Sequence, residues 1–303
     1  MRRANNMIKV FTFGGLGNQM FQYAAARALA ERLNTSVCID TSLHSVHTRN
    51  TTPRNYELAC FVLSGKQEKE VSSKFRGFLF RKVYPKIKNS FFGKQMAGKY
   101  HLFEDKDAYH FNSELLSLQD NALLLGYFQT EKYFSSCENR IREAFRFGKP
   151  LVGKNSELAE KINSCNAVSV HIRRGDYITN KNCANTYRLL TSDYYKKAVE
   201  LIRKRVENPV FFIFSDEPES AKTAVDLPHA ICIDWNKGGN SYIDMQLMSC
   251  CHHHIIANSS FSWWGAWLNR RADKTVIAPA GWLKEKEADA GINDLLPEKW
   301  IRL

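Results

Sequence analysis

The sequence predicts an α/β fold made of two doubly wound parallel sheets, one in each half of the chain. Strand-like segments alternate with helical segments in both halves, which is typical of parallel sheets covered by helices. Polar and charged residues follow directly on several apolar strands, where such folds bind ligands. The length of 303 residues is enough for two domains, and 44% apolar with 24% charged residues predicts a soluble globular protein.

The first predicted unit is a strand, a glycine-rich turn, a helix and a second strand. These are "IKVFTF", "GGLG", "NQMFQYAAARALAERLN" with apolar residues at helical spacing, and "SVCID". The turn matches the dinucleotide fingerprint only weakly, because the spacing counted from Gly15 needs a small residue where the chain has Met20. Glycines still let a ligand approach the backbone, so Gly15, Gly17, Asn18 and Gln19 are candidate contacts.

Residues 64–110 interrupt the alternation and predict a basic helical insertion. Eleven Lys or Arg residues occur between 66 and 106, interleaved with Phe and Tyr. We expect helices with apolar faces inward and basic faces toward solvent. An alternative interpretation stays open: a surface that docks on an acidic membrane or a glycolipid.

The segment "NALLLGYFQTEKYF" returns to a strand followed by a helix, and it places Tyr127 and Gln129 at the end of the strand. Just before it, "EDKD" holds Asp105 and Asp107 at the D-x-D spacing of metal-dependent sugar-nucleotide transferases. No strong apolar strand precedes this pair. We therefore predict a solvated turn there rather than a metal site.

The segment "FRFGKPLVGKNSE" near 146–157 combines Gly, Pro and polar residues as an interdomain linker does, which predicts domains at 1–150 and 151–303. The second half then alternates regularly. Its predicted elements are strand 167–172, helix 192–206, strand 210–214, helix 218–225, strand 230–234, helix 241–251, strand 254–257, helix 261–270 and strand 275–278.

Strand 167–172 runs into "VHIRRGDY", which places charges at the end of a buried strand. A period of two puts His171 and Arg173 on the same face. Arg173 could bridge a diphosphate with two parallel hydrogen bonds, and Asp176 could orient its guanidinium or His171. A structural Arg–Asp pair is the alternative, but the adjacent charges of Arg173 and Arg174 favour an anion site.

Two further strand ends carry polar residues. "FFIFSDEPES" ends in Asp216, which either faces a ligand or caps the next helix. "IIANSSF" opens a helix with Ser259 and Ser260, where N–H groups suit an anion or a polar base, although an ordinary cap is the alternative. Asp244, one helix earlier, could accept two N–H bonds from guanine or be a solvated helix residue.

The cluster "CCHHH" at 250–254 suggests zinc by composition alone. Five consecutive residues cannot converge on one tetrahedral ion without unusual backbone geometry, so we predict no metal site.

The formal net charge of +12 indicates an anionic partner. Eight scattered cysteines without a CxxC pair are typical of a reducing compartment, so we expect a cytoplasmic protein. No segment approaches the roughly 18 apolar residues of a membrane span.

Taken together, "GGLGNQMFQYA", "GYFQTEKYF", "VHIRRGDY", "FSDEP", "YIDMQLM", "IIANSSFSWWGAWL" and "VIAPAGWL" with "LPEKWI" resemble the bacterial α-1,2-fucosyltransferases, of the glycosyltransferase family 11 type. The motifs occur in that order along nearly the whole chain. The resemblance thins to scattered positions between 41 and 110.

This resemblance implies the GT-B arrangement, in which two Rossmann-like domains face a cleft. The first domain would be mainly on the acceptor side, and the second would hold GDP-β-L-fucose. The implied donor-binding residues are Arg173, Arg174, Asp216, Asp244, Ser259, Ser260, Gly15 and Gly17. The implied acceptor-binding residues are Asn18, Gln19, Tyr127 and Gln129.

The resemblance also implies an inverting transfer, without metal or cofactor, to the 2-hydroxyl of a terminal galactose on a glycan. Arg173 and Asn18 would lie at the reaction centre, and His171 and Asp176 are the candidate basic catalysts. Peripheral association with the inner face of a membrane stays open. The alternatives from other classes are a nucleic-acid-binding protein, suggested by the basic charge, and a nicotinamide-dependent oxidoreductase.

Overall fold

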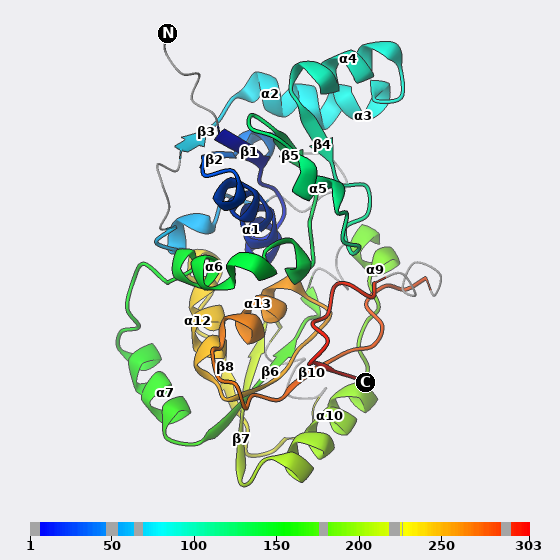
Figure 1. The fold of residues 1–303 in the computed structure, drawn as a ribbon. Helices are drawn as coiled ribbons and strands as arrows, with labels where there is room; N and C mark the ends of the chain where they lie inside the picture. Colours follow the sequence, from blue (N-terminus) through cyan, green and yellow to red (C-terminus); the bar gives the residue numbers. More distant parts are fainter. Residues whose placement is uncertain are drawn as a thin grey trace. The chain divides into compact units, whose positions relative to one another are not determined.

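The computed structural model describes residues 7–46, 54–63, 69–175, 181–217, 225, 227–285 and 292–303. It divides into two compact units, each of the α/β type (Figure 1). Unit 1 comprises Met1–Gly148 and Asn293–Leu295, and unit 2 comprises Lys149–Ile292 and Leu296–Leu303. The sequence-predicted boundary at residue 150 falls close to the division between the units.

Within the described residues, unit 1 has a five-stranded parallel sheet in the order β3-β2-β1-β5-β4. Its strands are β1 (Met7–Phe11), β2 (Ser36–Asp40), β3 (Lys69–Val71), β4 (Leu102–Glu104) and β5 (Leu123–Leu125). Strands β3 and β4 were not predicted, because three residues are too few to show a hydrophobic period.

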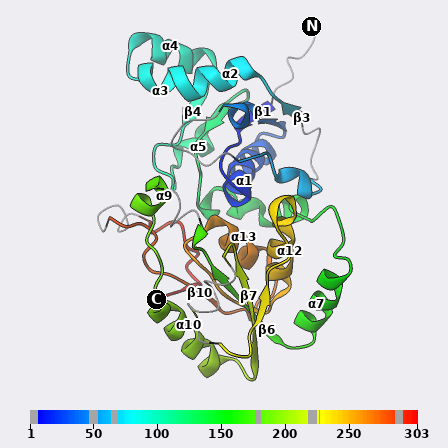
Figure 2. The ribbon, with the colours of Figure 1, turned by 180° about the vertical axis from the view of Figure 1, so that it is seen from behind.

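Helices cover both faces of this sheet. Alternate residues of β1 point to opposite faces, so Phe11 packs with Leu43, Phe80 and Tyr84. The helical elements of unit 1 are α1 (Leu16–Arg32), η1 (Ser42–Ser45), η2 (Leu58–Cys60), α2 (Lys74–Phe78), the π-helical turn η3 (Leu79–Val83), α3 (Tyr84–Ile87), α4 (Phe91–Lys99), α5 (Glu114–Ser117), η4 (Glu131–Tyr133), η5 (Ser135–Cys137) and α6 (Glu138–Ala144). Helices α2, α3 and α4 lie together as one group (Figures 1 and 2).

Unit 2 has a six-stranded parallel sheet, as far as it is described, in the order β11-β10-β9-β6-β7-β8. Its strands are β6 (Asn166–Ile172), β7 (Pro209–Ser215), β8 (Ile231–Ile233), β9 (His253–Ile255), β10 (Val276–Ala278) and β11 (Ile301–Arg302). The central strand β6 is buried on both faces, as expected for a doubly covered parallel sheet, although one of its faces carries Ser169 and His171.

The helical elements of unit 2 are α7 (Lys154–Asn163), α9 (Lys181–Thr186), α10 (Ser192–Arg205), η6 (Gly238–Asn240), α12 (Tyr242–Cys250) and α13 (Ser260–Leu268). Helix α10 packs on the face formed by Val168, Val170 and Ile172. Helices α7 and α12 pack on the opposite face, against Phe212 and Phe214. Figures 1 and 2 show α7 and α10 on either side of β6 and β7.

The predicted α/β class with two parallel sheets is confirmed. Most predicted elements of unit 2 match within two residues, for example helix 241–251 with α12 and strand 210–214 with β7. Part of the predicted linker is instead helical, because α7 begins at Lys154. The predicted helix 218–225 falls almost entirely outside the described residues.

Candidate active site

Three of the predicted motifs follow neighbouring strands of unit 2. Strand β6 lies between β9 and β7, with Val170 paired to Ile255 and Ile172 paired to Ser215. Because the strands are parallel, their carboxyl ends meet at one edge of the sheet. This edge therefore brings together the "RRG" segment after β6, Asp216 after β7 and the start of α13 after β9.

Asp216 is the organising carboxylate of this edge. Its Oδ1 accepts the backbone N–H of Arg174 at 3.0 Å, and its Oδ2 accepts the backbone N–H of Gly175 at 3.0 Å. The Oδ2 also lies 3.0 Å from Nη1 of Arg173. The side chains of Arg173 and Asp216 are 22% and 24% exposed, so the pair is held by the fold and still reaches solvent. Asp216 thus fixes both the loop and the guanidinium.

His171 lies beneath this loop and is buried. Its ring is 5.8 Å from that of Phe261 in the first turn of α13, and Nδ1 has no hydrogen-bond partner among the described residues. Burial, with the nearby charge of Arg173, lowers the pKa of His171 to about 3. A buried imidazole with so low a pKa is a poor proton acceptor near neutral pH, which argues against the predicted role as a basic catalyst. Asp176, the other candidate, lies outside the described residues.

Ser259 and Ser260 stand at the start of α13. Ser259 takes the N-cap position, and its side chain makes no capping hydrogen bond to the described first turn. The first N–H groups of a helix have no partner within the helix, and they carry a partial positive charge. Because Arg173 follows the neighbouring strand β6, this edge is suited to an anion.

Asp244, in the first turn of α12, belongs to a polar network. Its Oδ1 accepts a hydrogen bond from Asn236 Nδ2 at 2.8 Å. Asn236 in turn exchanges hydrogen bonds of 3.0 Å with Asn155, which also accepts from Trp235 Nε1 at 2.9 Å. Burial raises the pKa of Asp244 to about 7. The carboxylate is therefore held in one orientation at a partly desolvated site, rather than solvated.

The candidate residues of unit 1 gather where β1 and β5 end. Gly14 has a φ of +76°, and a Cβ on it would lie 2.7 Å from Nδ2 of Asn18, so the turn requires glycine. Asn18 Oδ1 accepts a hydrogen bond of 2.7 Å from Gln129 Nε2. The strand-end residue Gln129 and the helix-start residue Asn18, 111 positions apart, thus form one pair.

Gln19 is fully buried, and its amide bonds to backbone groups. Nε2 donates to the carbonyls of Gly14 and Asn55 at 2.9 and 2.8 Å, and Oε1 accepts the N–H of Glu57 at 2.9 Å. This places Gln19 in a positioning role for the glycine-rich turn. Gly17 is buried in the same helix, whereas Gly15 has open space where a Cβ would be.

Tyr127 and Gln129 lie in a turn that Asp105 supports. Tyr127 is 39% exposed, with its ring 4.9 Å from that of Phe13. Asp105 Oδ2 accepts the backbone N–H of buried Phe128 at 3.0 Å. The predicted solvated turn is therefore wrong for Asp105, because the carboxylate folds back under a turn that is distant in sequence. Asp107 is exposed and pairs with His110 at 2.7 Å.

Two substitutions of Asp105 are expected to separate the effect of its hydrogen bond on stability from the effect of its charge. Burial raises the pKa of Asp105 to about 6 from 3.8, so this carboxyl favours folding at low pH and that contribution is lost as the pH rises through 6. At pH 8, Asp105→Asn should keep an acceptor for Phe128 and remove the charge. Asp105→Ala should be less stable than Asp105→Asn by about 1–3 kcal/mol in urea unfolding, since it leaves a buried N–H unpaired.

Asp107→Ala is the matched control, and we expect it to change the free energy of unfolding by less than about 0.5 kcal/mol. Equal stability of the two Asp105 variants would contradict the supporting role of Asp105.

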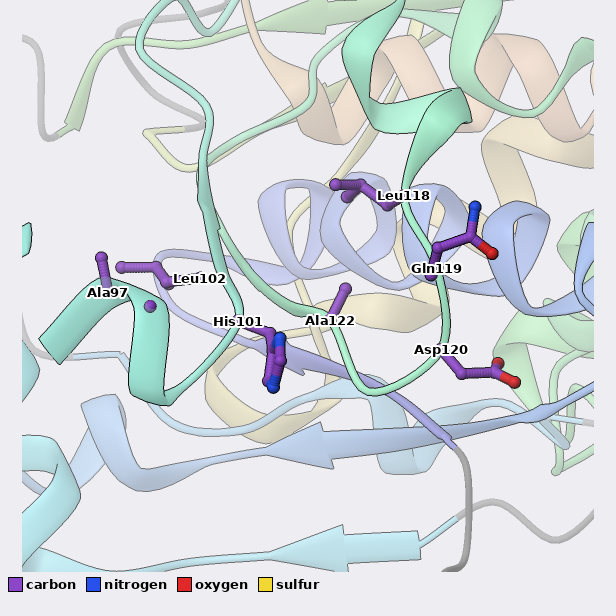
Figure 3. A pocket seen from close by; sticks show the side chains of 8 residues that line it. Ala97, His101, Leu102, Leu118, Gln119, Asp120 and Ala122 are labelled. Atoms are coloured by element: carbon purple, nitrogen blue, oxygen red, sulfur yellow. The ribbon is translucent and has the colours of Figure 1, made fainter. Parts of the chain in front are cut away.

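A pocket of unit 1 lies away from these residues. It opens at the amino ends of β4 and β5 (Figure 3). Gln129, in contrast, follows the carboxyl end of β5. Its lining residues are Ala97, Gly98, His101, Leu102, Leu118, Gln119, Asp120 and Ala122. Parallel α/β sheets bind ligands at carboxyl ends, so we do not include this pocket in the candidate site.

The "CCHHH" cluster contributes to the core of unit 2. His254 is fully buried between Ser169 Oγ and Asn269 Nδ2, at 2.8 Å from each. Since the Asn269 amide donates to Nε2, the Nδ1–H donates to Ser169, and Ser169 is not activated as a nucleophile. His253 Nδ1 accepts the N–H of Thr275 at 3.0 Å.

Sequence reasoning missed several residues that position the site. Asn155 and Asn236, which flank Asp244, lie 81 positions apart, so no local pattern joins them. Glu57 is half-buried near the start of α1; burial raises its pKa, while a hydrogen bond from the Leu16 N–H opposes the shift. The only sequence signal for Glu57 is that it is a charged residue within a short apolar segment.

No helix in the described parts of the chain is both long and apolar enough to cross a membrane.

The model of "Glycosyl transferase family 11" matches residues 1–303. The chain is 35% identical to the O-antigen biosynthesis glycosyltransferase WbnK of Escherichia coli, over 96% of this chain and 98% of that protein. It is 34% identical to an α-1,2-colitosyltransferase of Escherichia coli, over 96% of each. A galactoside α-(1,2)-fucosyltransferase 1 of Rattus norvegicus is 30% identical over 33% of this chain and 27% of its own length.

Solved structures show the same fold at low identity. The fucosyltransferase NodZ from Bradyrhizobium aligns over 87% of this chain and 92% of its own, with a TM-score of 0.52 and 13% identity. A mutant of Arabidopsis thaliana FUT1 in complex with GDP aligns over 90% of this chain and 70% of its own, with a TM-score of 0.50 and 8% identity. Both are fucosyltransferase structures of the GT-B type, which confirms the predicted fold class.

Proposed function

The chain belongs to glycosyl transferase family 11, and from that premise we propose that it transfers L-fucose from GDP-β-L-fucose to the 2-hydroxyl of a terminal galactose on a glycan. The observation that carries this proposal is the edge of the unit 2 sheet where Arg173, Asp216 and the start of α13 come together. The family membership leaves no ground for the nucleic-acid-binding and oxidoreductase alternatives. The eight scattered cysteines support a cytoplasmic location.

Arg173 is proposed to bind the diphosphate of the donor. A guanidinium presents a planar fork that matches two phosphate oxygens, and Asp216 restrains it by a contact to one nitrogen, Nη1. The N-terminal N–H groups of α13 add a partial positive charge. When the bond between C1 of the sugar and the diphosphate breaks, negative charge grows on the leaving group. Donors that are already in place stabilise that charge without reorganisation.

Asp244 is proposed to recognise guanine. Guanine presents N1–H and the 2-amino group side by side, and one carboxylate can accept both. The bond from Asn236 occupies Oδ1 from one side and fixes the plane of the carboxylate. Each carboxylate oxygen has a second lone-pair direction that remains for a base. Adenine presents an acceptor instead at N1, which this carboxylate would repel.

Asn18, Gln129 and Tyr127 are proposed to contact the acceptor sugar. Asn18 and Gln129 present amide groups in a fixed pair, which suits the hydroxyls of a sugar. Tyr127 adds a partly exposed aromatic ring, on which the apolar face of galactose can stack. Attack by the acceptor hydroxyl on the face opposite the leaving group inverts C1, which converts a β-linked donor into an α-linked product. GDP leaves with the electron pair of the broken bond, and the proton of the hydroxyl passes to a base, for which Asp176 is the remaining candidate.

A 3-deoxy donor is the second candidate. The α-1,2-colitosyltransferase is 34% identical over almost the whole chain, and colitose is L-fucose without the hydroxyl at C3. Guanine and diphosphate recognition would be the same for both donors. Discrimination would then depend on whether a polar group contacts the 3-hydroxyl.

The test is an assay of the purified full chain with GDP-L-fucose and GDP-colitose, using N-acetyllactosamine as the acceptor. We expect a product carrying one added deoxyhexose in α-1,2 linkage, established by NMR, and a higher kcat/KM with GDP-L-fucose. The acceptor methylated at the 2-hydroxyl of galactose should give no product.

If kcat/KM were higher with GDP-colitose, the proposed donor would be GDP-colitose instead of GDP-L-fucose, and the proposed roles of the residues would stay the same. Transfer to another hydroxyl, or no transfer from either GDP-sugar, would contradict the proposal.

A further inference from the structure

Four phenylalanines of the α2–α4 group are exposed. Phe75, Phe78, Phe91 and Phe92 are 70%, 54%, 70% and 72% exposed, whereas the Phe80 ring of the same group is 2% exposed in the core. Single exposed apolar residues are common, but large aromatic rings gathered on one group of helices indicate a surface that is covered by something. We refer to these four residues with Lys74, Lys86, Lys94 and Lys99 as the aromatic–basic surface.

The charge of this segment has one sign. From 71 to 103 the chain contains eight Lys or Arg residues and no Asp or Glu. Two of these residues pair with carboxylates that lie outside the stretch: Arg76 contacts Asp40 at 3.2 Å, and Lys88 contacts Glu104 at 2.7 Å. The four lysines of the aromatic–basic surface are exposed and form no ion pair with a described carboxylate. The surface therefore combines apolar rings with uncompensated positive charge.

The helices display these residues outward because their inner sides are fixed to the sheet. A Cβ on Gly77 would lie 2.2 Å from the carbonyl oxygen of Ser42, so α2 is pressed against η1. With 100° per residue, Phe75 then lies on the side of α2 opposite Gly77, and Phe78 lies about 100° around the helix from Gly77, where its ring is also exposed.

Helix α4 is arranged in the same way. Met96, Ala97 and Tyr100 pack on the core, and Phe91 and Phe92 lie on the outer side. Ser90 caps the helix by accepting the N–H of Gly93 at 3.2 Å, so the two rings stand at an ordered helix start. Figures 1 and 2 show α2, α3 and α4 grouped together, at the margin of unit 1.

We propose that the aromatic–basic surface docks unit 1 on an anionic lipid bilayer. Phe rings that enter the boundary between headgroups and acyl chains, with Lys on the same segment, are the composition of helices that bind at membrane interfaces. Lysine is depleted at the core of protein–protein interfaces, which makes a second protein chain the poorer match. The long lysine side chains can extend beside the rings and place their ammonium groups at lipid phosphates.

The experiment is co-flotation of the full chain with vesicles, without donor or acceptor, so that its outcome is separate from that of the transfer assay. Binding is expected to vesicles of phosphatidylglycerol mixed with phosphatidylcholine. Much weaker binding is expected to phosphatidylcholine alone and at high salt. Phe91→Ser with Phe92→Ser should weaken binding to anionic vesicles at least about tenfold. Lys86→Gln, Lys94→Gln and Lys99→Gln together should weaken it about a hundredfold.

The matched controls lie in unit 2. Val152→Ser removes another exposed apolar side chain, and Lys161→Gln, Lys196→Gln and Lys204→Gln remove three exposed charges. Neither control should change vesicle binding, and all variants should keep their Tm and their turnover on a soluble acceptor.

Three outcomes would overturn the proposal. The first is equal binding to neutral vesicles, and the second is no loss of binding in the surface variants. The third is a dimer in sedimentation velocity that the phenylalanine variant abolishes, since it would assign the surface to a second copy of the chain.

Discussion

Arg173→Lys is expected to lower kcat/KM by about a hundredfold to a thousandfold while the protein stays folded. Lysine keeps the positive charge but loses the planar fork that contacts two phosphate oxygens. A charge-assisted pair that strengthens as the leaving group develops charge is worth roughly 3–4 kcal/mol of barrier, which gives this range. The measurement is steady-state kinetics with the GDP-sugar that the chain uses, with thermal unfolding recorded in parallel.

Arg174→Lys is the control at the next position. Arg174 donates its backbone N–H to Asp216, and a lysine retains that backbone bond. We therefore expect at most a several-fold loss of activity. If Arg173→Lys were folded and almost fully active, Arg173 would be a structural partner of Asp216 and the proposed diphosphate contact would be wrong.

The central part of the site could be predicted because parallel sheets simplify the geometry. Strands β6 and β7 are long, mostly apolar segments, and a charged residue follows each of them. Once the sheet is recognised as parallel, residues after neighbouring strands must meet at one edge. Arg173 and Asp216 were each expected at a strand end, with Asp176 as the predicted partner of Arg173, whereas the structure places Asp216 3.0 Å from Arg173.

The depth of a residue could not be predicted in the same way. A period of two placed His171 and Arg173 on one face, but it does not say where along the strand that face becomes exposed. The Phe261 ring of α13 lies 5.8 Å from the His171 ring, whereas Arg173 follows the end of β6 and contacts Asp216. Two residues on the same face thus differ in exposure, with His171 at 5% and the Arg173 side chain at 22%.

The contacts that support the site depend on long-range geometry. Asp105 holds the turn at Phe128, and Gln129 contacts Asn18 across 111 positions. In each contact the two partners come close in space only because the strands that precede them are neighbours in the sheet. In the first half, β3 and β4 are too short to be recognised, so that order could not be derived.

Asp244→Asn is expected to weaken binding of GDP about a hundredfold, and to weaken binding of ADP hardly at all. The variant keeps the shape of the side chain and an oxygen for Asn236, but it places an amide where guanine needs a second acceptor. Hydrogen bonds to a charged group contribute about 1.5–3 kcal/mol, and one unpaired donor on the base adds to the loss. Isothermal titration calorimetry of both nucleotides measures the change.

The pH dependence tests the same carboxylate independently. Burial raises the pKa of Asp244 to about 7, so in the unliganded protein this carboxyl is mostly protonated below pH 7. A protonated carboxyl cannot accept hydrogen bonds from both N–H groups of guanine. Binding of GDP should weaken about tenfold from pH 8 to pH 6 in the wild type. The Asn variant should lack this part of the change and show only the ionisation of the diphosphate, which is common to both proteins.

Inosine diphosphate separates recognition of the base from a general loss of the site. It lacks the 2-amino group, so the wild type should bind it more weakly than GDP, whereas Asp244→Asn should bind the two nearly equally.

Asp234→Asn, at an exposed carboxylate just after β8, is the matched control and should keep the preference of the wild type. The folded carboxylate has a raised pKa and therefore costs stability above pH 7, so the Asn variant should be at least as stable at pH 8. If Asp244→Asn were stable and still preferred GDP over inosine diphosphate, guanine would be recognised elsewhere in unit 2.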